Sequence, residues 1–154
     1  MCFYCSRIII SDLPALLPLL ECNSFINNAL CSDGNLVPRA IDWSEPNAYA
    51  DLKADCRCVT LIHLSSGTQT VSISVIIGCE VLYGNRSVWP HLWDCIRSCC
   101  APENNILYLC ITLRNARHDV DDFTSHYLRP NFLNVTEYAL SPLVVAVRAE
   151  GLKF

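Results

Sequence analysis

The chain has 154 residues, of which 52% are hydrophobic and 17% are charged, and its formal net charge at pH 7 is −4. This length fits one domain, and the chain is richer in apolar residues than an average globular domain, which is about 45–50% apolar and about 25% charged. A negative chain without clustered lysine and arginine is poorly suited to phosphate backbones, so no direct nucleic-acid partner is expected.

The first predicted strand is Arg7–Ile10, an apolar run that is followed by Ser11 and Asp12. A helix is predicted from Leu13 to about Ala29. Three of its leucines are expected to face the sheet: Leu16, Leu17 and Leu20. Asp12 has two interpretations, because a carboxylate before Leu-Pro is typical of a helix N-cap, whereas a carboxylate at the end of a strand can bind a ligand.

The second predicted strand is Leu36–Ile41, and its proline, Pro38, suits a strand at the edge of a sheet. Asp42 and Trp43 follow this strand. A tryptophan is commonly part of a core or of its rim, so Trp43 is either a packing residue or an apolar surface for a ligand ring.

The stretch Asp51–Thr70 is the part of the sequence that is hardest to assign. Cys58–Leu64 has the composition of a strand and is followed by a turn at Ser65–Thr68. It either forms a local hairpin with the next apolar run, Val71–Ile77, or is an insert that arises from altered splicing or from a gene-model error. Short apolar runs are ambiguous, and both interpretations stay open.

The apolar run Val71–Gly78 leads into Glu80-Val81-Leu82-Tyr83. In an open α/β sheet the ligand crevice lies outside the carboxyl ends of the strands. We therefore expect Glu80 and Tyr83 to form a polar catalytic edge.

The rest of the chain alternates between helices and strands. The predicted elements are a helix at Val88–Cys100, a buried strand at Ile106–Leu113, a helix at Val120–Leu128, and strands at Asn131–Tyr138 and Leu143–Ala149.

The eleven cysteines do not form paired Cys-x-x-Cys knuckles at regular spacing, so no metal site is predicted. Met1–Leu20 is apolar but contains Asp12 and two prolines, so neither a signal peptide nor a membrane-spanning helix is expected there. A cytoplasmic protein without a membrane partner is the resulting expectation.

Several stretches, in this order, resemble the seven-β-strand protein-lysine methyltransferases (methyltransferase family 16), which use S-adenosylmethionine. The stretches are Ser11 to Leu20 with Asn23 to Asn28, Ile41 to Trp43, and Ile76 to Tyr83. Within that group, Leu107 to Asn115 and the helix with Asp122-Phe123-Thr124 are similar to the elongation factor 2 lysine methyltransferases.

The resemblance implies an α/β fold, a partial Rossmann-like methyltransferase domain with an antiparallel carboxyl-terminal edge. Residues 1–154 would form a single incomplete domain, in which Met1–Ser6 and about 51–70 have no family counterpart. The family begins with a central strand and a Gly-x-Gly loop, where glycine lets the backbone approach the cofactor. No two of the five glycines here are close in sequence and none precedes Asp12, so the first strand is expected to be missing and the chain truncated.

The resemblance also implies roles for individual residues. Asp12 would bind the ribose of S-adenosylmethionine, Trp43 would lie against its adenine, and Cys79 would touch the cofactor where the family has a small residue. Glu80 would orient the incoming lysine, and Tyr83 would border the lysine channel.

Two functions follow from these expectations. The first is a protein-lysine N-methyltransferase that acts on elongation factor 2 or on another translation factor or chaperone, with activity impaired in this chain. The second is a catalytically inactive isoform or fragment that serves at most as a protein-interaction module. The lack of any Gly-x-Gly favours the second.

Overall fold

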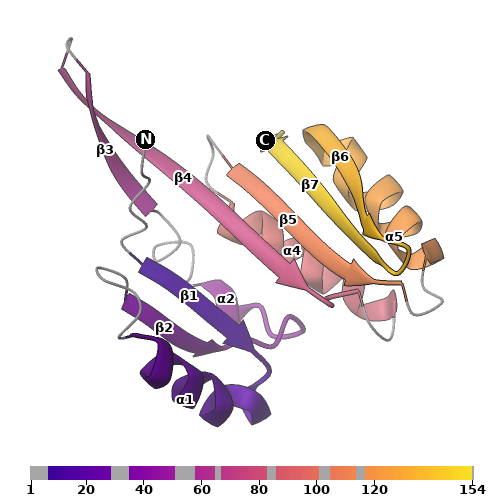
Figure 1. Cartoon of the computed structure of the whole chain (residues 1–154), viewed down its shortest axis with the longest axis horizontal. Coiled ribbons are helices and arrows are strands. Elements are labelled where there is room, and N and C mark those ends of the chain that lie inside the picture. Colours follow the sequence, from indigo (N-terminus) through magenta and orange to yellow (C-terminus); the bar gives the residue numbers. More distant parts are fainter. Residues whose placement is uncertain are drawn as a thin grey trace.

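The structure of the chain is a computed structural model that describes residues 7–28, 35–50, 58–64, 67–82, 86–100, 105–113 and 117–153. The seven strands are β1 (Arg7–Asp12), β2 (Asn35–Ala40), β3 (Cys58–Leu64), β4 (Gly67–Cys79), β5 (Asn105–Thr112), β6 (Phe132–Ser141) and β7 (Val144–Leu152). The helical segments are η1 (Pro14–Leu16), α1 (Leu17–Asn28), α2 (Asn47–Ala50), η2 (Arg86–Val88), α4 (Trp89–Cys99), α5 (Arg117–Phe123), η3 (Thr124–Leu128) and α6 (Arg129–Asn131). The strands form a two-stranded sheet, β1-β2, and a five-stranded sheet in the order β3-β4-β5-β7-β6 (Figure 1).

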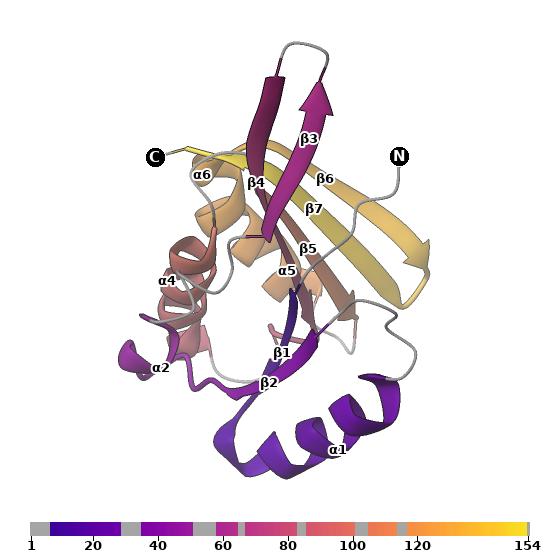
Figure 2. The same ribbon diagram turned by 90° about the vertical axis from the view of Figure 1, so that its left-hand side faces the viewer.

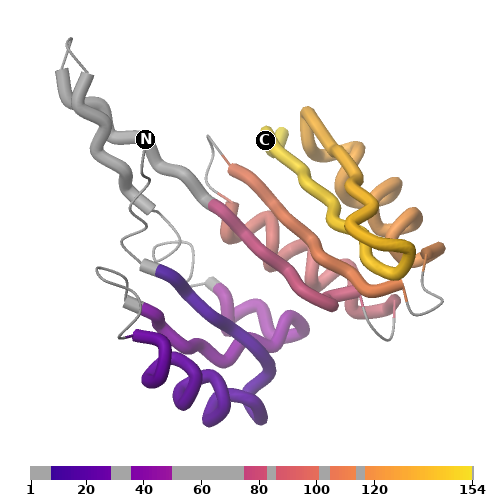
Figure 3. The backbone as a smooth tube through the Cα atoms, in the orientation of Figure 1, coloured from indigo at the N-terminus to yellow at the C-terminus, as the bar shows by residue number. Residues whose placement is uncertain are grey.

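Strands β1 and β2 pair in parallel, and α1 lies between them along the chain, as Figure 3 shows. Ser24 is the buried residue of α1, and its hydroxyl donates a hydrogen bond to the Leu36 carbonyl over 2.9 Å. Leu17 and Leu20 are half-buried, but the prediction for Leu16 was wrong, since this residue is exposed. The reason is that the α-helix begins only at Leu17, after a separate 3-10 turn, so Leu16 is not on its inner face.

The long strand β4 has two different partners. Its first half pairs antiparallel with β3, in a register that places Cys58 opposite Ile73 and Leu64 opposite Gly67. Its second half, Ser74–Cys79, pairs parallel with β5. The local hairpin is therefore the interpretation that the structure supports for this stretch.

The carboxyl-terminal strands form an antiparallel edge. The last strand, β7, pairs antiparallel with both β5 and β6, and β6 is the outer strand. Because β7 reverses the direction of the parallel pair β4-β5, the sheet is mixed. This part of the predicted fold class is confirmed.

The main core lies between the five-stranded sheet and the layer formed by α4 and α5 (Figure 2). Alternate residues of β5 are buried: Leu107, Leu109 and Ile111. From the helical layer, Phe123 is fully buried and meets Trp89 edge-to-face and Tyr127 in a stacked arrangement. The opposite side of each strand points to a face that α4 and α5 do not cover.

Candidate functional site

The carboxyl ends of the parallel strands lie on one side of the molecule. In Figure 1 the arrowheads of β1, β2, β4 and β5 all point toward the same side. The connection from β1 leads outward to β2, whereas the connection from β4 leads in the opposite direction to β5. Although β1 and β4 belong to different sheets, the connections that follow them thus lead in opposite directions (Figure 1). Open α/β sheets bind ligands where the connections diverge in this way, outside the carboxyl ends of their strands.

Asp12 is the last residue of β1, and its side chain is exposed. One carboxylate oxygen, Oδ1, accepts a hydrogen bond from the Leu13 amide over 2.8 Å. The residue that precedes η1 as its N-cap is Leu13, so the N-cap interpretation of Asp12 is wrong. The physical reason is that a residue before proline is held in an extended conformation, which delays the helix by one residue.

The ends of β1 and β2 are joined by the main chain, since the Ile41 amide donates to the Asp12 carbonyl over 2.9 Å. The next residue in the chain, Asp42, accepts hydrogen bonds from the Ser44 amide over 2.9 Å and from the Ser44 hydroxyl over 2.6 Å. These hydrogen bonds, with a smaller contribution from His91, lower the pKa of Asp42. The turn formed by Asp42 and Ser44, which carries the negative charge of Asp42, therefore fixes the backbone on either side of Trp43.

Trp43 is half-buried and packs against both hydrophobic clusters of the molecule. One cluster is the main core, and the other is formed by Ile41 and Tyr49 with Ile9 and the α4 cysteines around them. Packing is therefore shown for Trp43, whereas its contact with a cofactor stays a prediction. Its position links the two-stranded sheet to the layer that carries α4.

Glu80 follows β4 directly and has a left-handed backbone, with φ of 57°. A side chain in this region costs about 1–2 kcal/mol, and such strained residues cluster at functional sites. Two hydrogen bonds to β5 hold it: its amide donates to the Cys110 carbonyl over 2.9 Å, and Oε1 accepts from the Thr112 amide over 2.7 Å. Glu80 therefore fixes the carboxyl end of β4 against that of β5.

Two substitutions separate the backbone strain of Glu80 from its hydrogen bond. Both Glu80→Ala and Glu80→Gly remove the carboxylate that meets Thr112, but only glycine relieves the left-handed strain. We expect the alanine variant to be less stable than the glycine variant by about 1 kcal/mol, measured by urea unfolding. Greater stability of the alanine variant would show that the backbone is not left-handed in solution.

Cys79 precedes Glu80 and is exposed. It pairs in register with Cys110 of β5, on the sheet face that α4 and α5 do not cover. Its side chain is thus accessible beside the strand ends, where the sequence predicts a cofactor contact. Tyr83, the other predicted catalytic residue, lies outside the described residues.

The sequence interpretation missed Arg86, which follows the loop after Glu80. Its guanidinium forms ion pairs of 2.6 Å with Asp119 and with Asp122, and it lies 5.0 Å from the ring centroid of Trp89. The hydrogen bond with Asp119 is the main reason that the pKa of Arg86 is raised. Arg86 fastens η2 to α5, and no local pattern in the sequence predicts this contact because the partners of Arg86 are more than 30 residues away along the chain.

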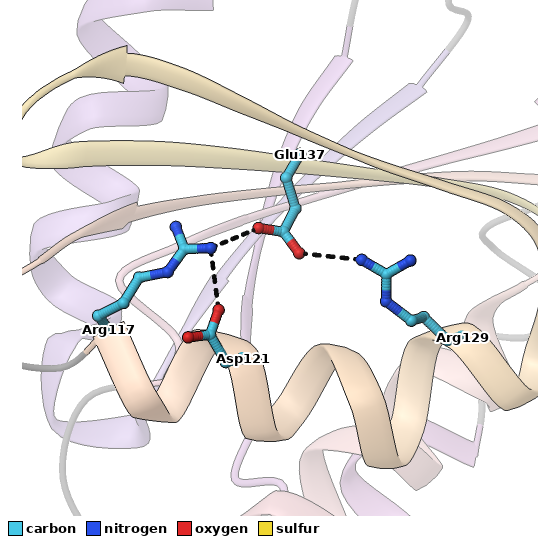
Figure 4. Close-up of polar contacts among 4 residues, drawn as sticks. All are labelled: Arg117, Asp121, Arg129 and Glu137. Atoms are coloured by element: carbon cyan, nitrogen blue, oxygen red, sulfur yellow. Dashed lines mark hydrogen bonds and ion pairs between the residues drawn. The ribbon is translucent and has the colours of Figure 1, made fainter.

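A second ion-pair network lies between α5, α6 and β6 (Figure 4). Glu137 of β6 accepts from Arg117 over 2.8 Å and from Arg129 over 3.3 Å, and Arg117 also contacts Asp121 over 2.9 Å. Exposed pairs of this kind contribute little stability, typically about 0–1 kcal/mol each. Since Glu137 lies on the outer strand, its carboxylate serves as a reference for substitutions at Glu80.

The described residues contain no cluster of three or more histidine, cysteine or acidic side chains that could hold a metal ion. Within the same part of the chain, no helix is long and apolar enough to cross a membrane.

Comparison with known proteins shows the fold. No family model matches the chain, and no curated protein matches it. Among solved structures, the chain is similar to a crystal structure from Pseudomonas syringae whose protein carries a provisional methyltransferase assignment. The TM-score is 0.54 at 12% sequence identity, over 94% of this chain and 72% of that chain. The chain therefore shares its α/β fold with that structure, which is consistent with a Rossmann-like fold.

Proposed function

We propose that this chain is a methyltransferase domain that uses S-adenosylmethionine and binds it where the connections diverge, between the carboxyl ends of β1 and β4. The observation that carries the proposal is the pair of acidic residues at these two ends, exposed Asp12 and strained Glu80, in a fold similar to a methyltransferase structure. Open α/β sheets place their ligands at this position.

The described residues fit one half of the cofactor. Asp12 offers a carboxylate for the ribose hydroxyls, Trp43 offers part of an aromatic face for the adenine, and Cys79 is exposed at the end of β4. A carboxylate accepts hydrogen bonds from both hydroxyls of a ribose. For the methionine half, the family resemblance requires a Gly-x-Gly loop, and the sequence contains none.

We further propose that the methyl acceptor is a lysine of a protein, and that the substrate is elongation factor 2 or another translation factor or chaperone. The support for this is the resemblance of the stretches around Leu107–Asn115 and Asp122–Thr124. Methyl transfer to an amine is a direct displacement, in which positioning supplies several kcal/mol. S-adenosylmethionine supplies the methyl group when it is bound.

In this proposal Glu80 orients the lysine and Tyr83 borders its channel. A carboxylate beside an ammonium stabilises the charged form, so Glu80 holds the lysine in place rather than removing its proton. Its hydrogen bond with the Thr112 amide fixes the direction of the carboxylate. A cytoplasmic location belongs to the same proposal.

A second candidate function is an inactive fragment or isoform that acts as a protein-interaction module. It is favoured by one observation, that no described strand lies between β1 and β4, where the proposed cofactor site has its centre. In this case the exposed strand edges would bind proteins, and Asp12 and Glu80 would have no ligand.

Nuclear magnetic resonance titration with S-adenosylhomocysteine, the unreactive product of the cofactor, distinguishes the two functions. The first predicts weak binding that shifts the amide signals of Asp12, Trp43 and Thr112 and leaves those of β6 unchanged. Shifts confined to other regions, or none at millimolar ligand, would contradict it and support the second function.

A further inference from the structure

Two cysteines form the last pair in the parallel register of β4 and β5. Cys79 lies opposite Cys110, and neither residue is part of a disulfide. Side chains that pair in register on neighbouring strands project to the same face of a sheet. Cys110 alternates with the buried residues Leu109 and Ile111, which face the helical layer. Both thiols therefore lie on the face that α4 and α5 do not cover.

This face is accessible to a reagent in solution. Cys79 is exposed and Cys110 is half-buried. Val75 and Ile77, which share the face with Cys79 on β4, are 52% and 69% exposed. Solvent therefore reaches the sheet at the ends of both strands, where the two thiols lie.

The spacing of the two strands suits a bond between these side chains. Neighbouring strands lie about 4.7–4.9 Å apart, and a disulfide joins Cα atoms that are about 4.4–6.8 Å apart. Its Cβ atoms are only about 3.5–4.5 Å apart, so two side chains that project in parallel must move slightly toward each other when the bond forms. A disulfide that needs such a movement is more easily reduced, which is typical of regulatory disulfides.

The hydrogen bonds of Glu80 hold the two thiols side by side. The Glu80 amide donates to the Cys110 carbonyl over 2.9 Å, and the Glu80 carboxylate accepts from the Thr112 amide over 2.7 Å. These bonds attach the residue that follows Cys79 directly to the end of β5. Groups that are held in position react as if they were at high concentration. Once one of these thiols is oxidised, the other is therefore placed to react with it.

Cys22 is a reference thiol in the same chain. It is exposed and is not part of a disulfide. It lies on α1, which contains no second cysteine. A reagent that modifies exposed thiols in general would therefore modify Cys22 as well as Cys79, whereas closure to a disulfide distinguishes a positioned pair from an exposed single thiol.

We propose that Cys79 and Cys110 are a redox-sensitive thiol pair that closes to a disulfide across the carboxyl ends of β4 and β5. The oxidant is a small disulfide such as oxidised glutathione. The Cys79 thiolate attacks one sulfur of the oxidant, which gives a mixed disulfide and releases one glutathione thiolate. The Cys110 thiolate then attacks the Cys79 sulfur and releases the second. Two cysteines are oxidised, one oxidised glutathione is reduced, and its two thiolates take up the two cysteine protons.

This inference does not depend on the proposed function, because the bond is measured without a cofactor or a methyl acceptor. The reduced chain is incubated with mixtures of oxidised and reduced glutathione. Remaining thiols are then blocked with N-ethylmaleimide, and mass spectrometry identifies the linked peptides after digestion. Peptides joined through Cys79 and Cys110 should be at least about tenfold more abundant than peptides joined through Cys22, because only the pair is held in position. Excess reduced glutathione should open the bond again.

Two substitutions and the unfolded chain serve as controls. Cys110→Ser should stop the reaction at the mixed disulfide of Cys79 with glutathione. Cys22→Ser should leave the bond between Cys79 and Cys110 unchanged. In urea the unsubstituted chain should lose its preference for this pair, because the register of β4 and β5 no longer exists. This last comparison holds even if a substitution impairs folding.

Three results would overturn the proposal. Equal preference for the pair in the native chain and in urea would show that the strand register does not select it. A stable mixed disulfide at Cys79 in the unsubstituted native chain would show that Cys110 does not reach Cys79. A bond that persists in excess reduced glutathione would show that the pair is not redox-sensitive.

Discussion

Replacing Trp43 by alanine is expected to lower the free energy of unfolding by about 2–4 kcal/mol, because truncating a large aromatic side chain in a core leaves a cavity. The ring packs against the main core and against the cluster around Ile41 and Tyr49. Its loss should therefore also loosen the attachment of the two-stranded sheet. Urea unfolding measures the first effect, and amide exchange of Ile9 measures the second.

The matched control is Trp93→Ala. Trp93 is also half-buried, but it packs against the main core, where it meets Phe132 edge-to-face at a centroid distance of 6.1 Å. This variant should lose stability without a selective increase in the exchange of Ile9. If Trp43→Ala weakened ligand binding but left stability unchanged, Trp43 would be a ligand residue alone and the packing role would be refuted.

A second large effect is expected for Glu80→Gln in the chain extended at its amino end by the strand and Gly-x-Gly loop that the family resemblance requires. Glutamine keeps an oxygen that can accept from the Thr112 amide but loses the charge that would attract an ammonium. Methyl transfer to lysine in elongation factor 2 should fall about 100-fold, equivalent to about 2.7 kcal/mol, while cofactor affinity stays within about threefold. A radiolabelled methyl-transfer assay and a calorimetric titration report the two quantities.

Glu137→Gln serves as the reference for this experiment, since Glu137 is also a hydrogen-bonded carboxylate on a strand but lies on the outer strand β6. It should alter neither methyl transfer nor cofactor affinity. Equal loss of cofactor affinity and of transfer in Glu80→Gln would assign Glu80 to the cofactor instead of the acceptor.

Much of the fold could be predicted from local patterns. The apolar run in β5 and the apolar spacing of α4 were enough to predict a buried strand and a helix. The turn residues between β3 and β4 made a hairpin one of the two interpretations that the sequence left open. The structure differs from the prediction where a single residue determines the position at which a helix begins. Pro14 delays the start of the helix, which moves Leu16 out of α1 and removes Asp12 from the N-cap position.

The candidate site was harder to predict from the sequence than the fold, because its geometry depends on contacts between segments that are distant in the chain. The left-handed backbone of Glu80 occurs together with its hydrogen bonds to β5, which is distant in sequence, and nothing in the residues around it indicates a positive φ. Arg86 acquires its role from Asp119 and Asp122 on another helix. Similarly, the two-sided packing of Trp43 exists only after both sheets are in place.

The resemblance to protein-lysine methyltransferases and the structural comparison agree on the level of the fold. The solved structure from Pseudomonas syringae shares 12% of residues with this chain, which shows a common fold and leaves the lysine acceptor and elongation factor 2 as proposals. In the part of the chain that the structure describes, β1 and β4 belong to two different sheets, and the missing central strand stays a prediction.

Calorimetric titration of S-adenosylmethionine tests most directly the proposal that the carboxyl ends of β1 and β4 form one cofactor site. The chain alone should bind far more weakly than micromolar, because in the proposal Asp12 and Trp43 would contact only the adenosine half of the cofactor. The chain extended at its amino end by a strand and a Gly-x-Gly loop, as the family resemblance requires, should bind about 100-fold more tightly, equivalent to about 2.7 kcal/mol. Micromolar affinity of the chain alone, or equal affinity of the two proteins, would contradict the account.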